Sequence, residues 1–288
     1  MAEKVIVAVD GGPASRAAVE WVLERAATGP LTLELTTVVE LGWAPAGGPE
    51  DDFHLVYERA ISEAGRRVHE AAPSIRRTSV VRRGTPVDEL IRASSTGDLL
   101  AIGTNKTGFM AGAVYGTLPL RLAAHSRCPL FVIPANWTPR SGSVVAGVED
   151  DAISDVALDF AAREASRLGT NLVIVHAWAI PATLGLDDGA MIPFDALREA
   201  HEEILARAVE RIRAEHPDLA VSAVLEQGSS AQALVDAALD AALLVVGTHG
   251  RGAIAGLILG SVSHDVLLNL PCPVAVVPRT YVGKQSSL

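Results

Sequence analysis

The sequence predicts an α/β protein made of two tandem domains, each a five-stranded, doubly wound parallel sheet. Two observations predict this class: the chain repeats itself, and each repeat alternates short apolar runs with longer amphipathic segments. Continuous apolar runs are typical of strands that are buried on both faces. Their alternation with helical segments indicates right-handed β-α-β units, so we expect helices on both faces of each sheet.

Five landmarks recur along the chain and identify the repeat. The opening run V-I-V-A-V-D-G-G-P-A-S at 5–15 returns as V-V-A-G-V-E-D-D-A-I-S, 139 residues later. The other four landmarks return after 144 residues: L-L-A-I-G-T-N at 99–105, Gly116-Thr117, Cys128-Pro129 and V-I-P at 132–134. A constant interval over several landmarks indicates a tandem duplication. The second half therefore carries five extra residues between its second strand and Gly228.

The elements of the first half follow from hydrophobic period and capping residues. Ser15 and Thr85 are the expected N-caps of two helices, because hydroxyl side chains can accept hydrogen bonds from the first helical amides. We expect strands at 5–9, 31–39, 78–83, 99–102 and 129–133, and further helices at about 51–72 and 117–126. The second half repeats this pattern through strands at 242–246 and 273–277.

Domain boundaries follow from the repeat and from one stretch rich in proline, glycine and serine. W-T-P-R-S-G-S at 137–143 has the composition of a linker. We therefore expect a first domain at 1–136, a second domain at 144–280 and a tail at 281–288.

Composition narrows the classes of partner. The chain of 288 residues has a net charge of −10, which disfavours nucleic acid and anionic membranes as partners. It contains no run of eighteen apolar residues, and its first residues do not resemble a signal peptide. Its two cysteines fit a reducing compartment, so we expect a cytoplasmic protein.

A glycine-dense loop after the apolar run at 242–246 is the main candidate for chemistry. Glycines allow the backbone to approach an anion closely, and the following helix start adds free amides and partial positive charge. Ser261 and Ser263 add hydroxyl groups there. Neither G-x-x-x-x-G-K-[ST] nor a G-x-G-x-x-G after the first strand occurs. From these residues alone, the loop either holds a phosphate or only makes a sharp turn.

The loop sequence G-T-H-G-R-G-A-I-A-G-L-I-L-G-S resembles the G-x2-G-x9-G-[ST] signature of ATP-binding universal stress proteins. The runs V-A-V-D-G-G-P-A-S and C-P-V-A-V-V-P resemble the opening and closing strands of that family. The chain as a whole is similar to a tandem-domain universal stress protein. This resemblance implies Rossmann-like domains of the adenine nucleotide α-hydrolase type, ATP with Mg²⁺ as ligand, and a regulatory stress-response role. It also implies that the last strands of the two halves pair with each other and form an internal pseudo-dimer. Two such chains can associate further into a homodimer.

Carried over by position, the resemblance assigns nucleotide-binding residues in both halves. The expected adenine and ribose contacts are Asp10 and Val38 in the first half and Glu149 and Ala177 in the second. The expected phosphate and ribose contacts of the second half are Gly247, His249, Gly250, Gly260, Ser261, Val262 and Ser263. Those of the first half are Gly103, Asn105, Lys106, Gly116, Thr117, Leu118 and Pro119.

Each half departs from the family pattern at a different place. Lys106 stands where the first half should have its second glycine, and Pro119, which lacks an amide hydrogen, stands opposite Ser263. The second half has the full loop but carries Glu149 in place of aspartate. We therefore expect both halves to bind ATP, the second more securely on the phosphate side.

Other functions stay open at this stage. A slow ATPase is one alternative, although no residue stands out as a base for activating water. An interaction module without nucleotide is another. We interpret Asp10 and Glu149 as ribose- or adenine-binding carboxylates rather than general bases. Cys128 and Cys272 are interpreted as small buried residues, and no histidine pair has the H-x-x-x-H spacing of a metal site.

Overall fold

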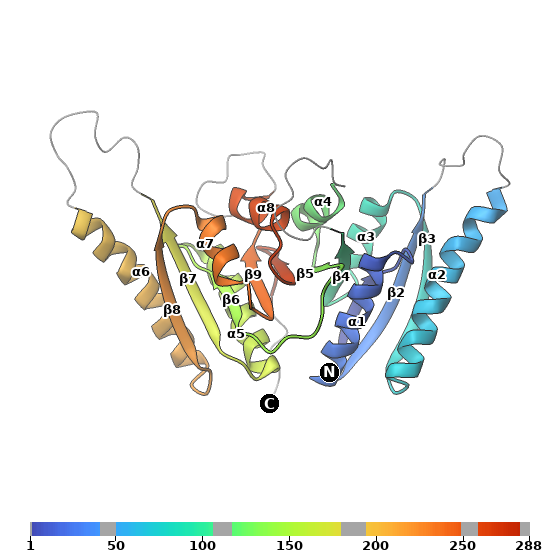
Figure 1. Cartoon of the computed structure of the whole chain (residues 1–288), viewed down its shortest axis with the longest axis horizontal. Coiled ribbons are helices and arrows are strands. Elements are labelled where there is room, and N and C mark those ends of the chain that lie inside the picture. The colour runs from blue at the N-terminus through green and yellow to red at the C-terminus, as the bar shows by residue number, and fades with distance from the viewer. Residues whose placement is uncertain (1, 41–49, 106–116, 180–193, 249–258, 283–288) are drawn as a thin grey trace.

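The computed structural model describes residues 2–40, 50–105, 117–179, 194–248 and 259–282. The two halves share one ten-stranded sheet with the order β3-β2-β1-β4-β5-β10-β9-β6-β7-β8 (Figure 1). Within each half all described strand pairs are parallel. The predicted α/β class, with five parallel strands in each half, is therefore confirmed.

Each half runs through the same series of strands and helices. The first half contains β1 (Glu3–Ala8), α1 (Pro13–Ala27), β2 (Leu31–Val39), α2 (Glu50–Ala71), β3 (Arg76–Arg83), α3 (Pro86–Ser94), β4 (Leu99–Thr104), α4 (Leu118–His125) and β5 (Leu130–Pro134). The second half contains β6 (Val144–Gly147), α5 (Ala152–Leu168), β7 (Leu172–Trp178), α6 (Phe194–Glu215), β8 (Val221–Gln227), α7 (Ser230–Ala237), β9 (Leu243–Gly247), α8 (Ser261–Leu268) and β10 (Val274–Val277).

Comparison of these bounds places the five extra residues of the second half. The helices α2 and α6 are related by an interval of 144 residues, whereas the ends of β2 and β7 are related by 139. The extra residues therefore lie in the connection between β7 and α6.

The sheet is covered by helices on both faces. Alternate residues of β1 show this arrangement, because Val5 and Val7 belong to one apolar cluster and Ile6 belongs to the other. The first cluster includes residues of α1, α2, α5 and α6, and the second includes residues of α3, α4, α7 and α8. Each cluster contains residues of both halves, so the apolar core continues across their junction.

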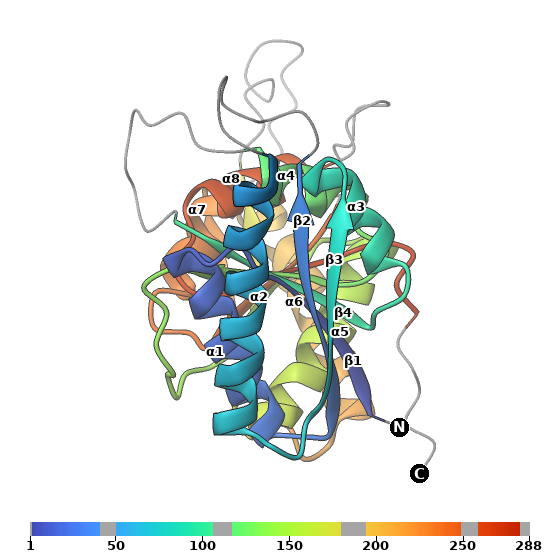
Figure 2. The same cartoon turned by 90° about the vertical axis from the view of Figure 1, so that its right-hand side faces the viewer.

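The halves meet through their last strands. β5 and β10 pair antiparallel, with Phe131 opposite Ala275. The expectation that the last strands join the halves edge to edge is thus confirmed within the chain. The helices α2 and α6 lie at opposite outer flanks (Figure 1). The helices α4 and α8 lie at the end of the molecule toward which β2 and β3 run (Figure 2).

One predicted helix start is wrong. Ser15 does not cap α1, because the helix already begins at Pro13 with Gly12 as its N-cap. Proline is favoured at the first helical position, where its missing amide hydrogen has no helical partner to lose. The Ser15 hydroxyl instead accepts a hydrogen bond from the Asp10 amide at 3.3 Å and donates to the Gly12 carbonyl at 3.1 Å. Thr85 caps α3 as predicted, because its side chain accepts a hydrogen bond from the Asp88 amide.

Candidate functional site

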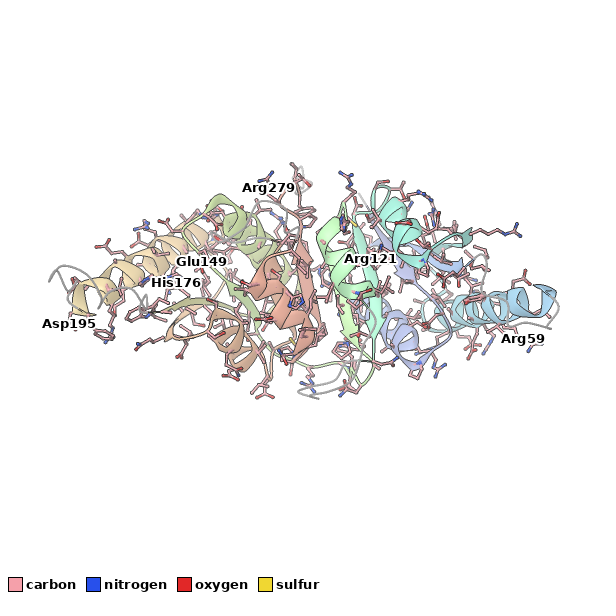
Figure 3. All side chains as sticks on the ribbon, turned by 90° about the horizontal axis from the view of Figure 1, so that it is seen from above. Arg59, Arg121, Glu149, His176, Asp195 and Arg279 are labelled. Carbon is pink, nitrogen blue, oxygen red and sulfur yellow. The ribbon has the colours of Figure 1, made fainter. Side chains whose placement is uncertain are left out.

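The order of the strands reverses at one point in each half. In the first half the chain moves outward from β1 to β3 and then returns to the other side of β1 with β4. In the second half the same reversal occurs between β6 and β9. Ligands of doubly wound sheets bind at the carboxyl ends of the strands beside such a reversal. Figure 3 looks down onto this end of the sheet. It labels Glu149, which follows β6, and His176, which lies on the neighbouring strand β7.

Asp10 follows β1 and holds the turn into α1. Its Oδ1 accepts a hydrogen bond from the Gly12 amide at 2.8 Å, while Gly11 between them has a positive φ of 81°. Asp10 itself is exposed. The turn therefore fixes the position of the carboxylate beside the reversal point and leaves it accessible to a ligand.

The equivalent turn of the second half is built differently. Asp151 accepts a hydrogen bond from the Ser154 amide at 2.7 Å, and the Ser154 hydroxyl donates to the carbonyl of Glu149 at 2.7 Å. Ser154 thus takes the place of Ser15, and here the side chain of Asp151 holds the turn. The longer Glu149 side chain is half-buried.

The two described ends of the second glycine loop are held together. The Gly260 amide donates to the Thr248 carbonyl at 2.7 Å, and the buried Ser263 hydroxyl donates to the carbonyl of Gly247. This second contact uses the only hydrogen of the Ser263 hydroxyl, so Ser263 offers a ligand its amide rather than a hydroxyl donor. Ser261 is exposed at the start of α8.

The start of α8 presents backbone amides. The first helical hydrogen bond runs from the His264 amide to the Gly260 carbonyl at 2.9 Å, so the three preceding amides belong to the orphan donors of a helix start. No side chain of a described residue caps this helix, and its first turn has no acidic residue. These amides belong to Ser261, Val262 and Ser263.

The start of α4 presents fewer amides. Its first helical bond runs from the Arg121 amide to the Thr117 carbonyl at 2.9 Å, and one of the three residues between them is Pro119. Proline has no amide hydrogen, so Leu118 and Leu120 supply the only donors of this turn. No side-chain cap is present here among the described residues. Arg121 marks α4 in Figure 3.

Two other helices show what a closed helix start looks like in this protein. Thr85 accepts a hydrogen bond from the Asp88 amide at the start of α3, and Ser229 accepts one from the Gln232 amide at the start of α7. These two caps are equivalent positions of the duplication, and the uncapped starts of α4 and α8 lie within one residue of equivalent positions. In each half, a hydroxyl side chain thus caps one helix, α3 or α7. The helix after the glycine loop, α4 or α8, has no side-chain cap among the described residues, so its first amides can donate to another acceptor.

Gly103 has a packing role that the sequence did not reveal. A Cβ atom at this position would lie 1.9 Å from the Ala14 carbonyl oxygen and 2.7 Å from the Ser15 amide nitrogen. The end of β4 therefore requires glycine because the start of α1 crosses it closely. Asn105, just after β4, is exposed.

A histidine pair beside the expected base-binding residue of the second half was also missed. His176 is buried, and its Nδ1 donates to the Val148 carbonyl at 2.8 Å. Its Nε2 lies 2.8 Å from Nδ1 of His201, whose ring stacks on Trp178 at 5.2 Å. In the first half Thr37 and Tyr57 occupy the equivalent positions. No sequence signal reveals the pair, because its members come from β7 and α6.

The two predicted base-side residues lie near the ends of equivalent strands. Val38 is half-buried on β2, and Ala177 is almost fully buried on β7. Four predicted site residues lie outside the described part of the chain, namely Lys106, Gly116, His249 and Gly250.

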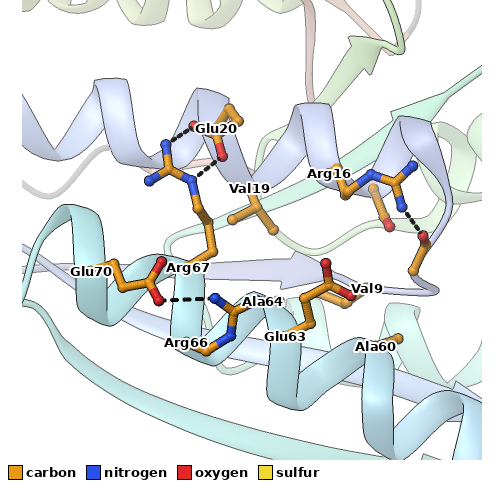
Figure 4. Close-up of a pocket in the computed structure, with 12 residues that line it drawn as sticks. Val9, Arg16, Val19, Glu20, Ala60, Glu63, Ala64, Arg66, Arg67 and Glu70 are labelled. Carbon is orange, nitrogen blue, oxygen red and sulfur yellow. Dashed lines mark hydrogen bonds and ion pairs between the residues drawn. The ribbon is translucent and has the colours of Figure 1, made fainter.

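A hollow of about 140 Å³ lies between α1 and α2 behind the Asp10 turn (Figure 4). Its walls carry charged side chains that pair with each other. Arg67 donates two hydrogen bonds of 2.6 Å to Glu20, and Arg66 donates one of 2.9 Å to Glu70. Since these charges satisfy each other, the hollow offers a ligand less than the helix starts do.

The cysteines are free and buried. Burial raises the pKa of both thiols to about 12. Because the thiolate is the reactive form, this agrees with the interpretation of Cys128 and Cys272 as structural residues. Across the described residues, no three histidine, cysteine, aspartate or glutamate side chains gather as a metal site would require. The described helices include none that is long and apolar enough to span a membrane.

Comparison with known proteins identifies the family. The model of the universal stress protein family matches residues 1–134 and 141–278. A universal stress protein of Mycobacterium tuberculosis (strain ATCC 25618 / H37Rv) is 31% identical over 293 residues, covering 96% of this chain and 97% of its own length. A second one from the same strain is 31% identical over 297 residues, covering 94% of each chain.

A solved structure has the same fold. The crystal structure of a universal stress protein from Archaeoglobus fulgidus DSM 4304 has a TM-score of 0.73, with 21% identity, and covers 96% of this chain and 98% of that chain. The duplicated sequence, the joined sheet and these matches lead to one assignment. The chain belongs to the universal stress protein family and carries the family domain twice.

Proposed function

We propose that the chain binds ATP with Mg²⁺ at the starts of α4 and α8 and acts as a regulatory stress-response protein. The observation that carries this proposal is the contrast between helix starts: α3 and α7 are closed by hydroxyl caps, whereas α4 and α8 are not. Uncapped amides at a helix start favour an anion such as phosphate. The glycine signature directly before α8 supports a nucleotide as the source of that phosphate.

The second half is proposed as the tighter site. It offers three backbone amides at the helix start where the first half offers two, because of Pro119. A hydrogen bond to a charged group contributes about 1.5–3 kcal/mol, which corresponds to about ten- to hundredfold in affinity. Asp10 and Glu149 would bind the ribose or adenine, with Val38 and Ala177 on the base side. Mg²⁺ would be held mainly by the phosphates, since the described residues offer it no cluster of ligands.

Localisation, domain boundaries and association of chains complete the proposal. We place the protein in the cytoplasm, in line with its two free, buried cysteines. The domain boundaries are proposed at 1–136 and 144–280, with 137–143, which contains no helix or strand, as the linker. Association of two chains into a homodimer is proposed through surfaces other than β5 and β10, since these two strands already pair with each other.

Nucleotide content tests the proposal directly. The purified protein is denatured, and the supernatant is chromatographed for adenine nucleotides before and after incubation. Near-stoichiometric ATP that persists is the expected result. ADP that accumulates during incubation would favour the slow ATPase instead. A protein without nucleotide, and without a thermal shift in millimolar ATP and Mg²⁺, would leave only the interaction module.

A further inference from the structure

The contact between the halves joins positions that the duplication makes equivalent. Phe131 and Ala275 are 144 residues apart, and they face each other where β5 pairs with β10. Arg25 of α1 and Glu164 of α5 are 139 residues apart, the interval that relates these two helices, and they form an ion pair. A residue that touches its own equivalent lies on the two-fold axis of the pair. Both contacts therefore lie on the pseudo-two-fold axis of the molecule.

The two helix residues on this axis, Arg25 and Glu164, are opposite in charge. Arg25 Nη1 and Nη2 each donate to one carboxylate oxygen of Glu164 at 2.8 Å, and the two side chains are 3% and 5% exposed. Glu3 accepts two further hydrogen bonds from Arg25, and Arg167 donates to Glu164 at 2.8 Å. Burial alone would raise the pKa of Glu164, but the charges of Arg25 and Arg167 lower it to about 2. Both partners are therefore ionised in the folded protein.

A third contact between equivalent positions extends the pattern. Arg167 of α5 donates a hydrogen bond to the hydroxyl of Thr28, the residue that follows α1, and these residues are again 139 apart. A donor on one half thus meets an acceptor on the other.

The residues on the axis are also complementary in size. The ring of Phe131 packs 4.6 Å from Trp21 of its own half and 5.9 Å from Phe160 of the other half. The position opposite Phe131 in the sheet is filled only by the methyl group of Ala275. The large ring therefore takes up the space on both sides of the axis.

We propose that the joining surface of each half is specific for the other half and rejects a second copy of itself. Two first halves would bury Arg25 against Arg25 and press Phe131 against Phe131, where facing Cα atoms lie about 4.5–5.5 Å apart. Two second halves would bury Glu164 against Glu164 and leave a gap between two alanines. A symmetric dimer of identical domains always places identical residues on its axis. Duplication within one chain removed that constraint and allowed an ion pair to form there.

Charge reversal in the full chain tests the proposal. Because removal of one member of a buried ion pair is strongly destabilising, Arg25→Glu and Glu164→Arg should each lower the melting temperature by about 10 °C. The double variant should melt well above either single variant. Its recovery stays partial, because Glu3 and Arg167 then face like charges.

The ion pair between Arg67 and Glu20 is the matched control. It is also joined by two hydrogen bonds, here from Nε and Nη2 of Arg67, but its side chains are 46% and 42% exposed at the hollow between α1 and α2 (Figure 4). Reversal of either residue, or of both, should change the melting temperature by less than about 2 °C.

Exchange of size gives a second test that does not depend on charge. Phe131→Ala with Ala275→Phe should melt above either single variant, because one ring again fills the space on the axis. An exchange variant that melts no higher than its more stable single variant would overturn the proposal. The same applies to a charge-reversal double variant that shows no recovery. If an interface single variant is insoluble, a soluble, folded double variant counts as recovery, and an insoluble one counts against the proposal.

Discussion

Replacement of Gly103 by alanine should destabilise the first half without involving any ligand. The added Cβ would lie 1.9 Å from the oxygen and 2.1 Å from the carbon of the Ala14 carbonyl, whereas ordinary contacts begin at 3.4 Å. The obstacle is backbone at the start of α1, so it cannot move aside as a side chain can. The start of α1 must therefore shift by about 1.5 Å relative to β4, against the close packing of the core.

The expected size of the effect follows from this overlap. Overpacking a well-filled core costs about 1–3 kcal/mol. Contact with backbone places Gly103→Ala at the upper end, and a loss of about 3 kcal/mol lowers the melting temperature by about 6–12 °C. Scanning calorimetry of the purified protein measures this shift. Gly29→Ala is the matched control, because no atom lies within 4 Å of its added Cβ.

A melting temperature of Gly103→Ala within about 2 °C of the wild type would refute this reasoning. In that case α1 would have to lie farther from β4 than the structure shows. The result also affects the nucleotide site, since weaker binding by a destabilised first half would not identify Gly103 as a ligand contact. Exposed positions are therefore better probes of the site than its glycines.

Three further predictions follow from buried and capping groups. Glu164→Gln should lower the free energy of unfolding at pH 7 and make that free energy fall less steeply in acid. The folded protein lowers the pKa of Glu164 from 4.5 to about 2, so the ionised carboxylate contributes up to about 3 kcal/mol of stability above pH 4.5. This contribution is lost as the pH falls toward 2. Urea unfolding between pH 7 and pH 2.5 measures this, and an unchanged pH dependence would contradict it. Cys128 and Cys272 should resist alkylation at pH 8 until urea unfolds the chain, as mass spectrometry can follow, and rapid labelling of the native protein would refute their burial. Thr85→Ala and Ser229→Ala should each cost about 1 kcal/mol by urea unfolding, and a wild-type midpoint in both would show that the caps contribute nothing.

Local signals in the sequence predicted most of the fold. The apolar runs, their spacing and the repeated landmarks predicted the strand and helix series of both halves, because these features depend on hydrophobic period and turn chemistry. Thr85 was identified as a cap for the same reason. Ser15 was assigned wrongly because two start signals competed: the glycine and proline before it begin the helix earlier, and its hydroxyl then joins the turn instead.

Contacts between segments that are distant in the chain could not be predicted from the sequence. The steric reason for Gly103 depends on where α1 crosses β4, and the pairing of His176 with His201 depends on the packing of α6 against β7. The ion pair between Arg25 and Glu164 spans the two halves. The single-residue patterns of such positions do not differ from those of ordinary strand or helix residues. Only the three-dimensional arrangement reveals them.

A titration with ATP and Mg²⁺ after removal of bound nucleotide tests the central claim most directly. Ser261 and Thr117 are equivalent and exposed, so a carboxylate introduced at either one repels phosphate while leaving the fold intact. Ser261→Glu should weaken the tighter binding event by tenfold or more, and Thr117→Glu should affect only the weaker one. Tight ATP binding that survives Ser261→Glu, or that is lost in Thr117→Glu alone, would contradict the assignment of the principal site to the second half.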